Sequence, residues 1–173
     1  MTHVYRLASA AALIAVAATG GCKPKAQLNT EAADSSLVMS LERGPCRGTC
    51  PVYRVDVYGD GRVQFDGQRH VATIGTKTGI ASVTAVQELL QKFRNGEFAK
   101  ADSAYVMDSP GCGSYATDLP VSKLSAKIGA GMKTVEHDPG CRNAPAFLKT
   151  LAAQVDSVAR TTQWIAGNGD AAK

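Results

Sequence analysis

Hydrophobic and polar residues alternate strictly on both sides of a glycine-rich turn, between Arg54 and Asp66. Successive side chains of a β-strand point to opposite faces, so this alternation predicts a β-hairpin with one buried face. A shift of one residue would turn every apolar side chain to water, and this fixes the register. The hairpin should place Val57 opposite Val63, Val55 opposite Phe65, and Arg54 opposite Asp66.

The predicted register leaves Gly59-Asp60-Gly61 as a three-residue loop. Loops of this kind end in a residue with positive φ, which glycine adopts without a Cβ clash, so Gly61 should form a G1 bulge. Arg54 and Asp66 would then form an ion pair on the exposed face. Such a pair contributes at most about 1 kcal/mol.

A first strand is predicted before the hairpin and a further short strand after it. Leu37, Met39 and Leu41 alternate with other residues within 35–41, which is the pattern of a half-buried strand. Residues 68–74 extend the meander by one strand, and residues 75–79 are predicted to be a loop. The N-terminal part of the sheet is therefore a meander of three or four strands.

A second hairpin is predicted from residues 122–128 and 132–137, around a loop at 129–131. Its register stays open, because the apolar positions match in two ways. Leu124, Ala126 and Ile128 face Val135 in one pairing, and they face Met132 and Thr134 in the other. Residues 100–118, between the meander and this hairpin, are predicted to be irregular.

Two helices are predicted from apolar residues at helical spacing. Within 82–95 the spacing is three or four residues, with Ser82 or the pair Thr84 and Gln87 as caps, and Gly96 as a positive-φ stop. The second helix begins near Asn143, with Pro145 in its first turn. The apolar stripes consist of Val86, Leu89, Leu90 and Phe93 in the first helix, and of Phe147, Leu148, Leu151, Val155 and Val158 in the second.

These elements predict an α+β fold in which two helices pack on one face of an antiparallel sheet. Trp164 and Ile165 fold back to close the core. The single domain is expected to cover residues 37–166, followed by a disordered tail at 167–173. About 150 residues remain after the N-terminal segment is removed, which is enough for one domain to bury its own core.

The first 21 residues have the features of a secretion signal. A short basic region precedes a dozen or so apolar residues, too few for the roughly 20 that span a bilayer. Small residues then precede Cys22. This segment resembles bacterial lipoprotein precursors, in which the cysteine after the signal receives a diacylglycerol and palmitate and becomes the mature N-terminus. Lys23 implies, by the same resemblance, sorting to the outer membrane of a Gram-negative cell. Residues 22–36 are predicted to be a lipidated flexible tether.

The charge balance argues against a nucleic-acid partner. The formal net charge is +4 for the whole chain, and it falls to +3 without the signal because that segment contains Arg6 and no acidic residue. No basic run of four or more residues occurs. The expected partners are the membrane, through the lipid on Cys22, and an envelope protein or a component of the cell wall. The sequence leaves the oligomeric state open.

Four cysteines remain besides Cys22. The compartment outside the cytoplasm is oxidising, and an even number of cysteines there indicates two disulfides. Of three pairings, local spacing favours Cys46 with Cys50 and Cys112 with Cys141. The second bridge would close a loop of about 30 residues, worth roughly 3 to 4 kcal/mol.

Two chemical alternatives compete with structural disulfides. Cys46-x-x-x-Cys50-Pro51 is similar to the motif of Sco-type copper chaperones, and thiolates with His70 or His137 would suit Cu(I). Against a thiol-redox or Cu(I) site, a strand follows the motif at once, whereas thioredoxin-like folds place it at a helix start. A hydrolase site around His137 lacks a serine in a nucleophile-elbow pattern. We therefore predict a non-catalytic module without metal or cofactor.

The hairpin carries a resemblance to a family. Residues 45–53 read Pro-Cys-Arg-Gly-Thr-Cys-Pro-Val-Tyr, and Tyr-Gly-Asp-Gly follows at 58–61. This is similar to bacterial lipoproteins with a domain of unknown function, whose signature is Pro-Cys-x-Gly-x-Cys-Pro-x-Tyr followed by Tyr-Gly-Asp-Gly. Further matching segments are 117–120 and 163–165, so the resemblance covers roughly 36–167. It implies a small single-domain envelope protein and brings no activity with it.

Overall fold

The computed structural model describes residues 34–166. The predicted signal peptide, the predicted lipidation site Cys22, most of the predicted tether and the predicted tail at 167–173 lie outside the described residues. Every member of the hydrophobic core cluster lies between Val38 and Ile165, so the described part contains a core of its own.

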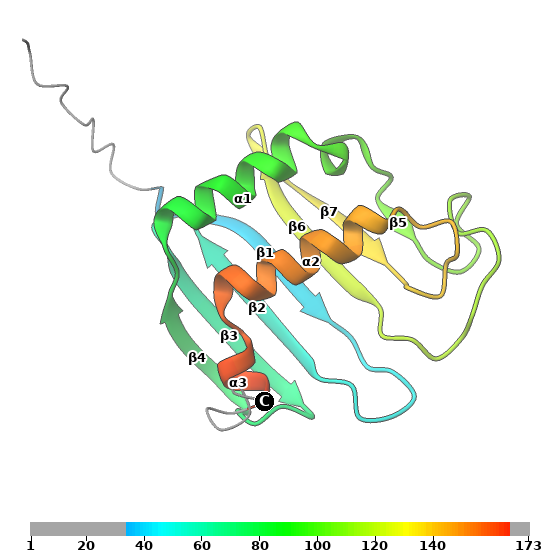
Figure 1. Ribbon diagram of the computed structural model, residues 1–173, viewed down its shortest axis with the longest axis horizontal. Helices are drawn as coiled ribbons and strands as arrows, with labels where there is room; N and C mark the ends of the chain where they lie inside the picture. The colour runs from blue at the N-terminus through cyan, green and yellow to red at the C-terminus, as the bar shows by residue number, and fades with distance from the viewer. Residues whose placement is uncertain (1–33, 167–173) are drawn as a thin grey trace, which may run out of the picture. The chain divides into compact units, whose positions relative to one another are not determined.

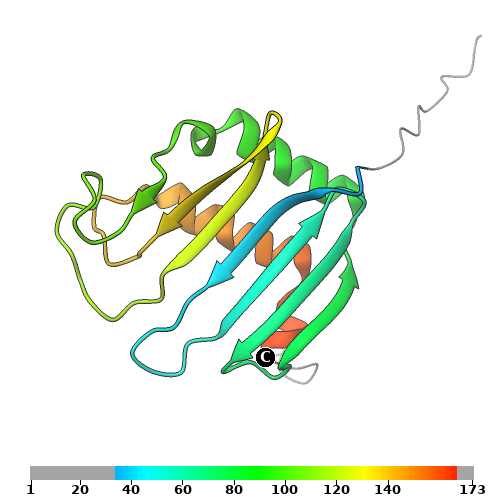
Figure 2. The same ribbon diagram turned by 180° about the vertical axis from the view of Figure 1, so that it is seen from behind.

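Seven strands form one sheet with the order β4-β3-β2-β1-β6-β7-β5 (Figures 1 and 2). All neighbours are antiparallel except β5 and β7, which run parallel. This confirms the α+β class and the antiparallel meander, which has four strands. The strands are β1 (Leu37–Arg43), β2 (Val52–Tyr58), β3 (Arg62–Arg69), β4 (Gly75–Ile80), β5 (Ala104–Tyr105), β6 (Ser122–Ile128) and β7 (Gly131–His137).

The register of the β2–β3 hairpin is as predicted, with Val57 opposite Val63 and Val55 opposite Phe65. Gly61 has φ of +88° and closes the three-residue loop. The predicted ion pair is wrong, although Arg54 does lie opposite Asp66. Arg54 instead contacts Asp56, two residues along its own strand, at 2.9 Å. The side chain of Asp56 is 14% exposed and that of Arg54 is 42% exposed, so this ion pair is partly shielded from water.

The fourth strand of the meander lies later in the chain than predicted. Residues 75–79, expected to be a loop, belong to β4, and the loop is at 70–74 between β3 and β4. Thr76, Lys77 and Thr78 are all exposed, so this strand has no alternation of apolar and polar residues. An outer strand with both faces largely in water does not produce the pattern on which the prediction depended.

The second hairpin has one of the two registers that the sequence left open, with Leu124 opposite Val135. Ile128 lies opposite Gly131, so the loop has two residues, Gly129 and Ala130. The segment predicted to be irregular contains the two-residue strand β5, which pairs with the end of β7. Tyr105 of β5 is buried there.

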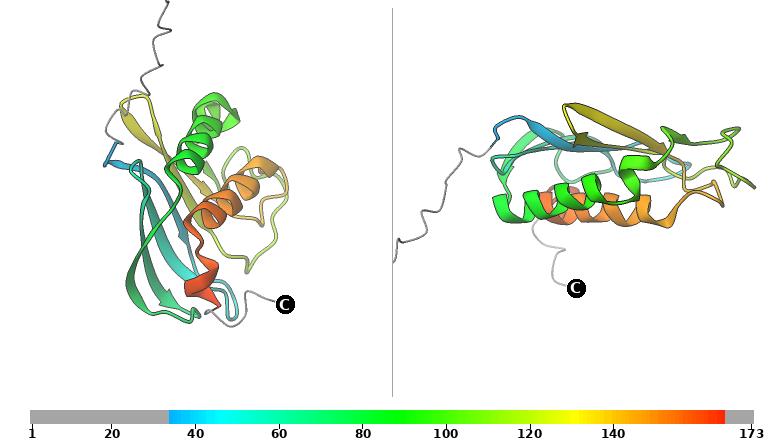
Figure 3. Two further views of the ribbon diagram at one scale, coloured as in Figure 1. Left: turned by 60° about the vertical axis from the view of Figure 1, so that its left-hand side comes forward. Right: turned by 90° about the horizontal axis from the view of Figure 1, so that it is seen from above.

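Both main helices, α1 (Val83–Asn95) and α2 (Ala146–Ala159), cover the same face of the sheet, as predicted (Figure 3). The apolar stripe of each helix packs on the apolar face of the sheet. The short elements η1 (Glu97–Lys100) and α3 (Thr162–Ile165) complete this layer. Trp164 of α3 is buried and its ring stacks on Phe65 at 5.1 Å, which confirms that the C-terminal segment closes the core. Within residues 34–166, none of the helices is long and apolar enough to cross a membrane.

The helix ends differ in detail from the predictions. Ser82 is the cap of α1 and accepts a hydrogen bond from the Ala85 N–H. Gly96 ends this helix with φ of −94°, not with a positive φ. Glycine is needed there for another reason, since a Cβ would lie 2.5 Å from the Lys92 carbonyl oxygen. The second helix begins at Ala146 with Pro145 as its cap, later than the predicted start near Asn143, whose N–H is held by the Cys112 carbonyl.

Candidate functional site

The two predicted cysteine pairs are both at disulfide distance. The Cα atoms of Cys46 and Cys50 are 5.7 Å apart, and those of Cys112 and Cys141 are 4.4 Å apart. The first pair lies in the loop between β1 and β2. The second joins the long loop before β6 to the loop after β7, and both of its sulfur-bearing residues are buried.

These loops meet at one end of the sheet, because β1 and β7 end where β2 and β6 begin. We call residues 44–51, 106–121 and 138–145 together the disulfide end. The Gly44 N–H donates to the Val121 carbonyl at 2.8 Å, and Arg47 forms an ion pair with Asp118 at 3.5 Å. The first disulfide loop is thus attached to the long loop beside it.

Main-chain hydrogen bonds hold the second pair of loops together around Cys112 and Cys141. The N–H groups of Ala116, Arg142 and Asn143 donate across the two loops at 3.0 to 3.1 Å. The Asp138 carboxylate accepts from the Tyr115 hydroxyl at 2.7 Å and from the Gly140 N–H at 2.8 Å. The bond to Asp138 raises the pKa of Tyr115. The disulfide end is therefore a set of irregular loops with defined positions, and not loosely attached chain.

His137, which the hydrolase hypothesis required, is the last residue of β7 and is buried beside this end. Burial lowers the pKa of its imidazole, and the nearby Arg43 also lowers it, while Asp138 acts in the opposite direction. The Ser122 hydroxyl donates to the His137 main-chain carbonyl at 3.4 Å. Within residues 34–166, no hydrogen bond joins the His137 ring to an acid or a hydroxyl, so the geometry gives this hypothesis no support.

A metal site at Cys46 and Cys50 gains no support either. In the described part of the chain, no group of three His, Cys, Asp or Glu side chains comes together to hold a metal ion. His70 lies in the exposed loop between β3 and β4. The two cysteines sit in a loop that leads into β2, so no helix start lies beside them to lower a thiol pKa.

A polar cluster that the sequence analysis missed lies under α2, next to the disulfide end. The Asp156 carboxylate accepts from the Arg43 guanidinium and the Tyr53 hydroxyl, each at 2.6 Å, and from the Thr161 hydroxyl at 2.9 Å. Arg43 also donates to the Tyr53 hydroxyl at 2.9 Å. Burial and the charge of Asp156 raise the pKa of Tyr53 well above its usual value. Burial lowers the pKa of Arg43, but Asp156 and Tyr53 together raise it above its usual value.

The cluster ties the last residue of β1 and the buried ring of Tyr53 to the helix above them. Its signal in the sequence is Asp156 itself, which follows Ala152 by four residues and so lies on the side of α2 that faces the sheet. Both carboxylate oxygens of Asp156 are engaged by these partners. The hydrogen bonds of this cluster hold α2 on the sheet, which is a structural role.

The comparison with protein families identifies the domain. A family model described as Domain of unknown function (DUF6438) matches residues 37–159, which is more than half of the chain. The chain belongs to this family. The match begins with the first residue of β1 and ends with the last residue of α2. No curated protein gives a significant match. Membership in an uncharacterised domain family confirms part of the predicted resemblance, while the lipoprotein character and the proposed signature stay predictions.

No helix of the described chain covers the second face of the DUF6438 sheet (Figure 2). The cross-strand rows on this face consist mostly of polar residues. Charges alternate in sign across its strands. One cross-strand row contains Glu136, Lys123, Glu42, Arg54 and Asp66, in that order from β7 to β3. Each charge therefore has cross-strand neighbours of opposite sign, and within the row the Arg54 guanidinium lies 3.8 Å from the Glu42 carboxylate.

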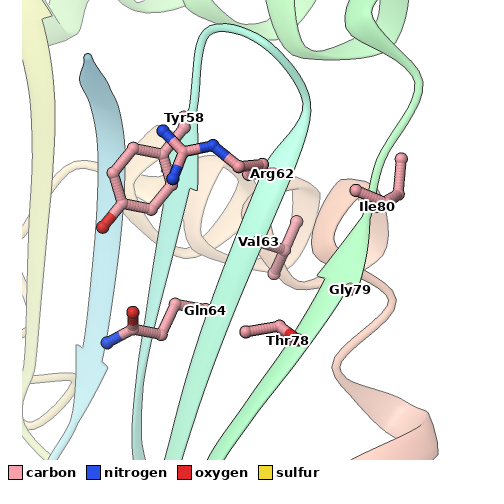
Figure 4. A pocket seen from close by; sticks show the side chains of 7 residues that line it. All are labelled: Tyr58, Arg62, Val63, Gln64, Thr78, Gly79 and Ile80. Atoms are coloured by element: carbon pink, nitrogen blue, oxygen red, sulfur yellow. The ribbon is translucent and has the colours of Figure 1, made fainter. Parts of the chain in front are cut away.

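A hollow of about 370 Å³ lies on this open face of the DUF6438 domain, over β2, β3 and β4 (Figure 4). The guanidinium of Arg62 covers the Tyr58 ring at 4.4 Å from its centroid and also pairs with Asp60 at 2.7 Å. The polar groups at this end of the hollow thus already have partners. On the other side the hollow is bordered by the outermost strand, through Thr78 and Ile80.

Proposed function

We propose that this protein is an envelope-anchored binding module without catalytic activity. A lipid on Cys22 would hold it at the membrane, and the disulfide end would bind an envelope protein or a component of the cell wall. The observation that carries the proposal is the disulfide end itself, where two cysteine pairs at disulfide distance fix exposed loops on a rigid sheet.

Loops held in place by a scaffold are where proteins most often carry binding residues. The disulfide end has such residues, since the side chain of Arg47 is 82% exposed, and the apolar residues Met107 and Leu119 are 56% and 43% exposed. Cross-links and main-chain bonds reduce the conformational entropy that these loops would lose on binding. Apolar and basic side chains together on fixed loops are suited to a protein surface or to an anionic cell-wall polymer.

The position at which the predicted tether joins the domain also supports a binding surface at the disulfide end. The predicted tether leads into β1 at Leu37, and the strand runs from there to Arg43 at the disulfide end. Seven residues of β-strand extend about 20 Å at 3.3 Å per residue. A lipid on Cys22 would therefore connect to the domain at the opposite end from these loops, which leaves them free to face a partner.

The buried ionisable groups support a structural rather than a catalytic role. The carboxylates of Asp138 and Asp156 each accept hydrogen bonds on both oxygens, from main-chain or side-chain donors nearby. Hydrogen bonds to both oxygens fix the position of each carboxylate within the fold, which favours a structural role.

The membrane anchor is tested by growing cells with an alkyne analogue of palmitate and comparing the native chain with Cys22→Ala. We expect label on the native chain alone, together with a shift of the variant out of the outer-membrane fraction. Equal labelling of both chains, or none in either, would contradict the anchor.

The binding surface is tested by placing a photo-crosslinking amino acid at Leu119 in living cells. Met132 provides the matched control, because it is also 43% exposed but lies in β7 at the hairpin end, away from the disulfide end. We expect a discrete cross-linked product from position 119 and none from position 132. Products from both positions, or from neither, would argue against a binding surface at this end.

Two assays on the purified protein distinguish the proposed binding module from the thiol-redox or Cu(I) alternative. A structural Cys46–Cys50 bridge should resist a glutathione buffer and take up no Cu(I). Ready reduction followed by stoichiometric Cu(I) uptake would replace the proposed function with metal chemistry at this loop.

A further inference from the structure

We propose that the free edge of β4 pairs with β4 of a second copy of this chain, so that two domains form one continuous sheet. The inference concerns a different surface from the disulfide end and does not rest on the proposed function. Among the strands of residues 34–166, β4 is outermost in the sheet and pairs on one side only, with β3 (Figures 1 and 4).

The hydrogen-bond pattern shows which groups of β4 point outward. The Ala81 N–H donates to the Gly61 carbonyl at 2.8 Å, and Arg62 lies opposite Ile80 next to that pair. Hydrogen-bonded and non-hydrogen-bonded pairs alternate in an antiparallel ladder, so Ile80, Thr78 and Thr76 turn their N–H and C=O groups away from β3. Within residues 34–166 no main-chain hydrogen bond satisfies these outward groups. They form a template for another strand.

The side chains around this edge are also incompletely covered. Ile80 and Ile74 are 73% and 64% exposed, more than any other large hydrophobic residue in the described part of the chain. Ile80 is the last residue of β4, and Ile74 directly precedes its first residue. Lys77 carries the one charge on the strand. A single lysine is weak protection for an edge that exposes apolar residues and free main-chain groups.

The strand is complementary to itself when two copies run antiparallel with the two-fold axis at Thr78. Thr78 then faces Thr78 of the second copy, and Ile80 faces Thr76 of the second copy on both sides of the axis. All three facing pairs consist of residues whose main-chain groups point outward. The contact can therefore form six main-chain hydrogen bonds, two in each of three pairs. Both copies use the same surface, as a closed dimer requires.

This register also matches the charges on the open face. Arg62 lies beside Ile80, and Asp66 lies beside Thr76, in the cross-strand rows of one copy. In the dimer, each row that begins with Arg62 would continue through Ile80 and Thr76 to Asp66 of the second copy. The alternation of charge that crosses each sheet would thus continue across the contact, and no like charges would face each other.

On the opposite face the register brings Lys77 next to Gly79 of the second copy. Gly79 has no side chain there because Trp164 lies under it, and a Cβ would be 3.0 Å from the indole ring. The lysine therefore faces a glycine and not another lysine. A register shifted by one pair, with the axis at Lys77, would place the two ammonium groups opposite each other and is disfavoured.

A contact between two strands of this length is small beside a standard interface of about 1,600 Å², so a dissociation constant in the micromolar range or weaker is expected. The test is sedimentation of the full mature chain in detergent across a range of concentrations. We expect a monomer–dimer equilibrium for the native chain.

Two variants test the edge itself. Thr78→Pro removes an outward N–H without removing a hydrogen bond to β3, which is where proline is tolerated in an edge strand. Ile80→Lys replaces the exposed apolar side chain with a charge, and Met132→Lys makes a similar change on the distant β7. We expect at least tenfold weaker dimerisation in each of the two β4 variants and no change in Met132→Lys. If Thr78→Pro does not fold, the comparison of Ile80→Lys with Met132→Lys still decides.

A chain that stays monomeric at every concentration would overturn the proposal, and so would a dimer that both β4 variants leave intact. The register is tested by Thr78→Cys with a bismaleimide of about 8 Å, which should join two copies, while Thr134→Cys should not. A photo-crosslinker at Thr78 that captures a different protein in the native envelope would show that another chain's strand occupies the edge, and would overturn pairing with a second copy.

Discussion

Replacing Asp156 by alanine should destabilise the domain more than any change of an exposed charge. The substitution removes the acceptor for Arg43, for the Tyr53 hydroxyl and for the Thr161 hydroxyl. Losing one partner of a fully buried ion pair costs about 3 to 5 kcal/mol, because the remaining charge is left without compensation. The Arg43 and Asp156 side chains are 30% and 20% exposed, so water compensates in part and the lower end, about 3 kcal/mol, is expected.

The assay is urea unfolding of the chain from Lys23 onward, monitored by tryptophan fluorescence. Trp164 is the one tryptophan of the sequence, and its buried ring stacks on Phe65, so its emission reports the core directly. With a urea dependence of about 2 kcal/mol per molar for a domain of this size, the midpoint should fall by about 1.5 M. The slope should not change, since the surface exposed on unfolding is the same.

Three further variants separate the charge from the packing. Asp156→Asn keeps the shape and one acceptor oxygen, so it should cost less than alanine. The double replacement Arg43→Met with Asp156→Leu removes both charges and should recover much of the stability, as other apolar replacements of buried ion pairs do. Lys149→Ala, an exposed change on the same helix, is the control and should be nearly neutral. An Asp156→Ala cost below about 1 kcal/mol, or one equal to that of Lys149→Ala, would refute the reasoning.

Two further predictions concern the two disulfide bridges and the buried imidazole of His137. Replacing Cys112 and Cys141 together by serine should lower the unfolding free energy by about 3 to 4 kcal/mol, because the bridge spans 29 residues. The same change in the β1–β2 loop, where the separation is 4, should cost about 2 kcal/mol, and calorimetry showing the reverse order would contradict the loop-length argument. The depressed pKa of His137 means that the unfolded chain takes up a proton first as the pH falls below 6.5, so stability should decline there. His137→Gln should reduce this decline, and His70→Gln, an exposed control, should not. The measurement is the unfolding free energy between pH 7.5 and 5. An equal effect of the two substitutions on its pH dependence would contradict the role of His137.

The parts of the fold that could be predicted are those in which one face is buried and the register has a single solution. In the first hairpin, Val57, Val63 and Phe65 match in one register, and the loop glycine at 61 agrees with it. The second hairpin could not be settled in this way, because small and apolar residues occur on both faces of its strands. Its register depends on the neighbouring β1, where Leu41 lies opposite Leu124.

The position of β4 could not be predicted from alternation, because alternation appears only where burial differs between the two faces of a strand. Thr76, Lys77 and Thr78 are exposed alike, and the pairing of β4 depends on the hydrogen bonds that it makes with β3. The side chains of such a strand are exposed like those of a loop, and only its main-chain pairing with β3 identifies it as a strand. For the same reason its outer edge has free main-chain groups without a protective pattern of charges.

The polar cluster is a different case, because the pattern contained a signal that only the tertiary structure explains. A charged residue on the sheet-facing side of α2 predicts that some basic group lies beneath the helix, since a buried carboxylate without a partner is costly. The sequence does not indicate which one, and Arg43 is 113 positions away. Arg43 is also the last residue of β1, directly before Gly44, whose N–H is bound to Val121. The ion pair that holds α2 on the sheet therefore also fixes the point from which the first disulfide loop begins.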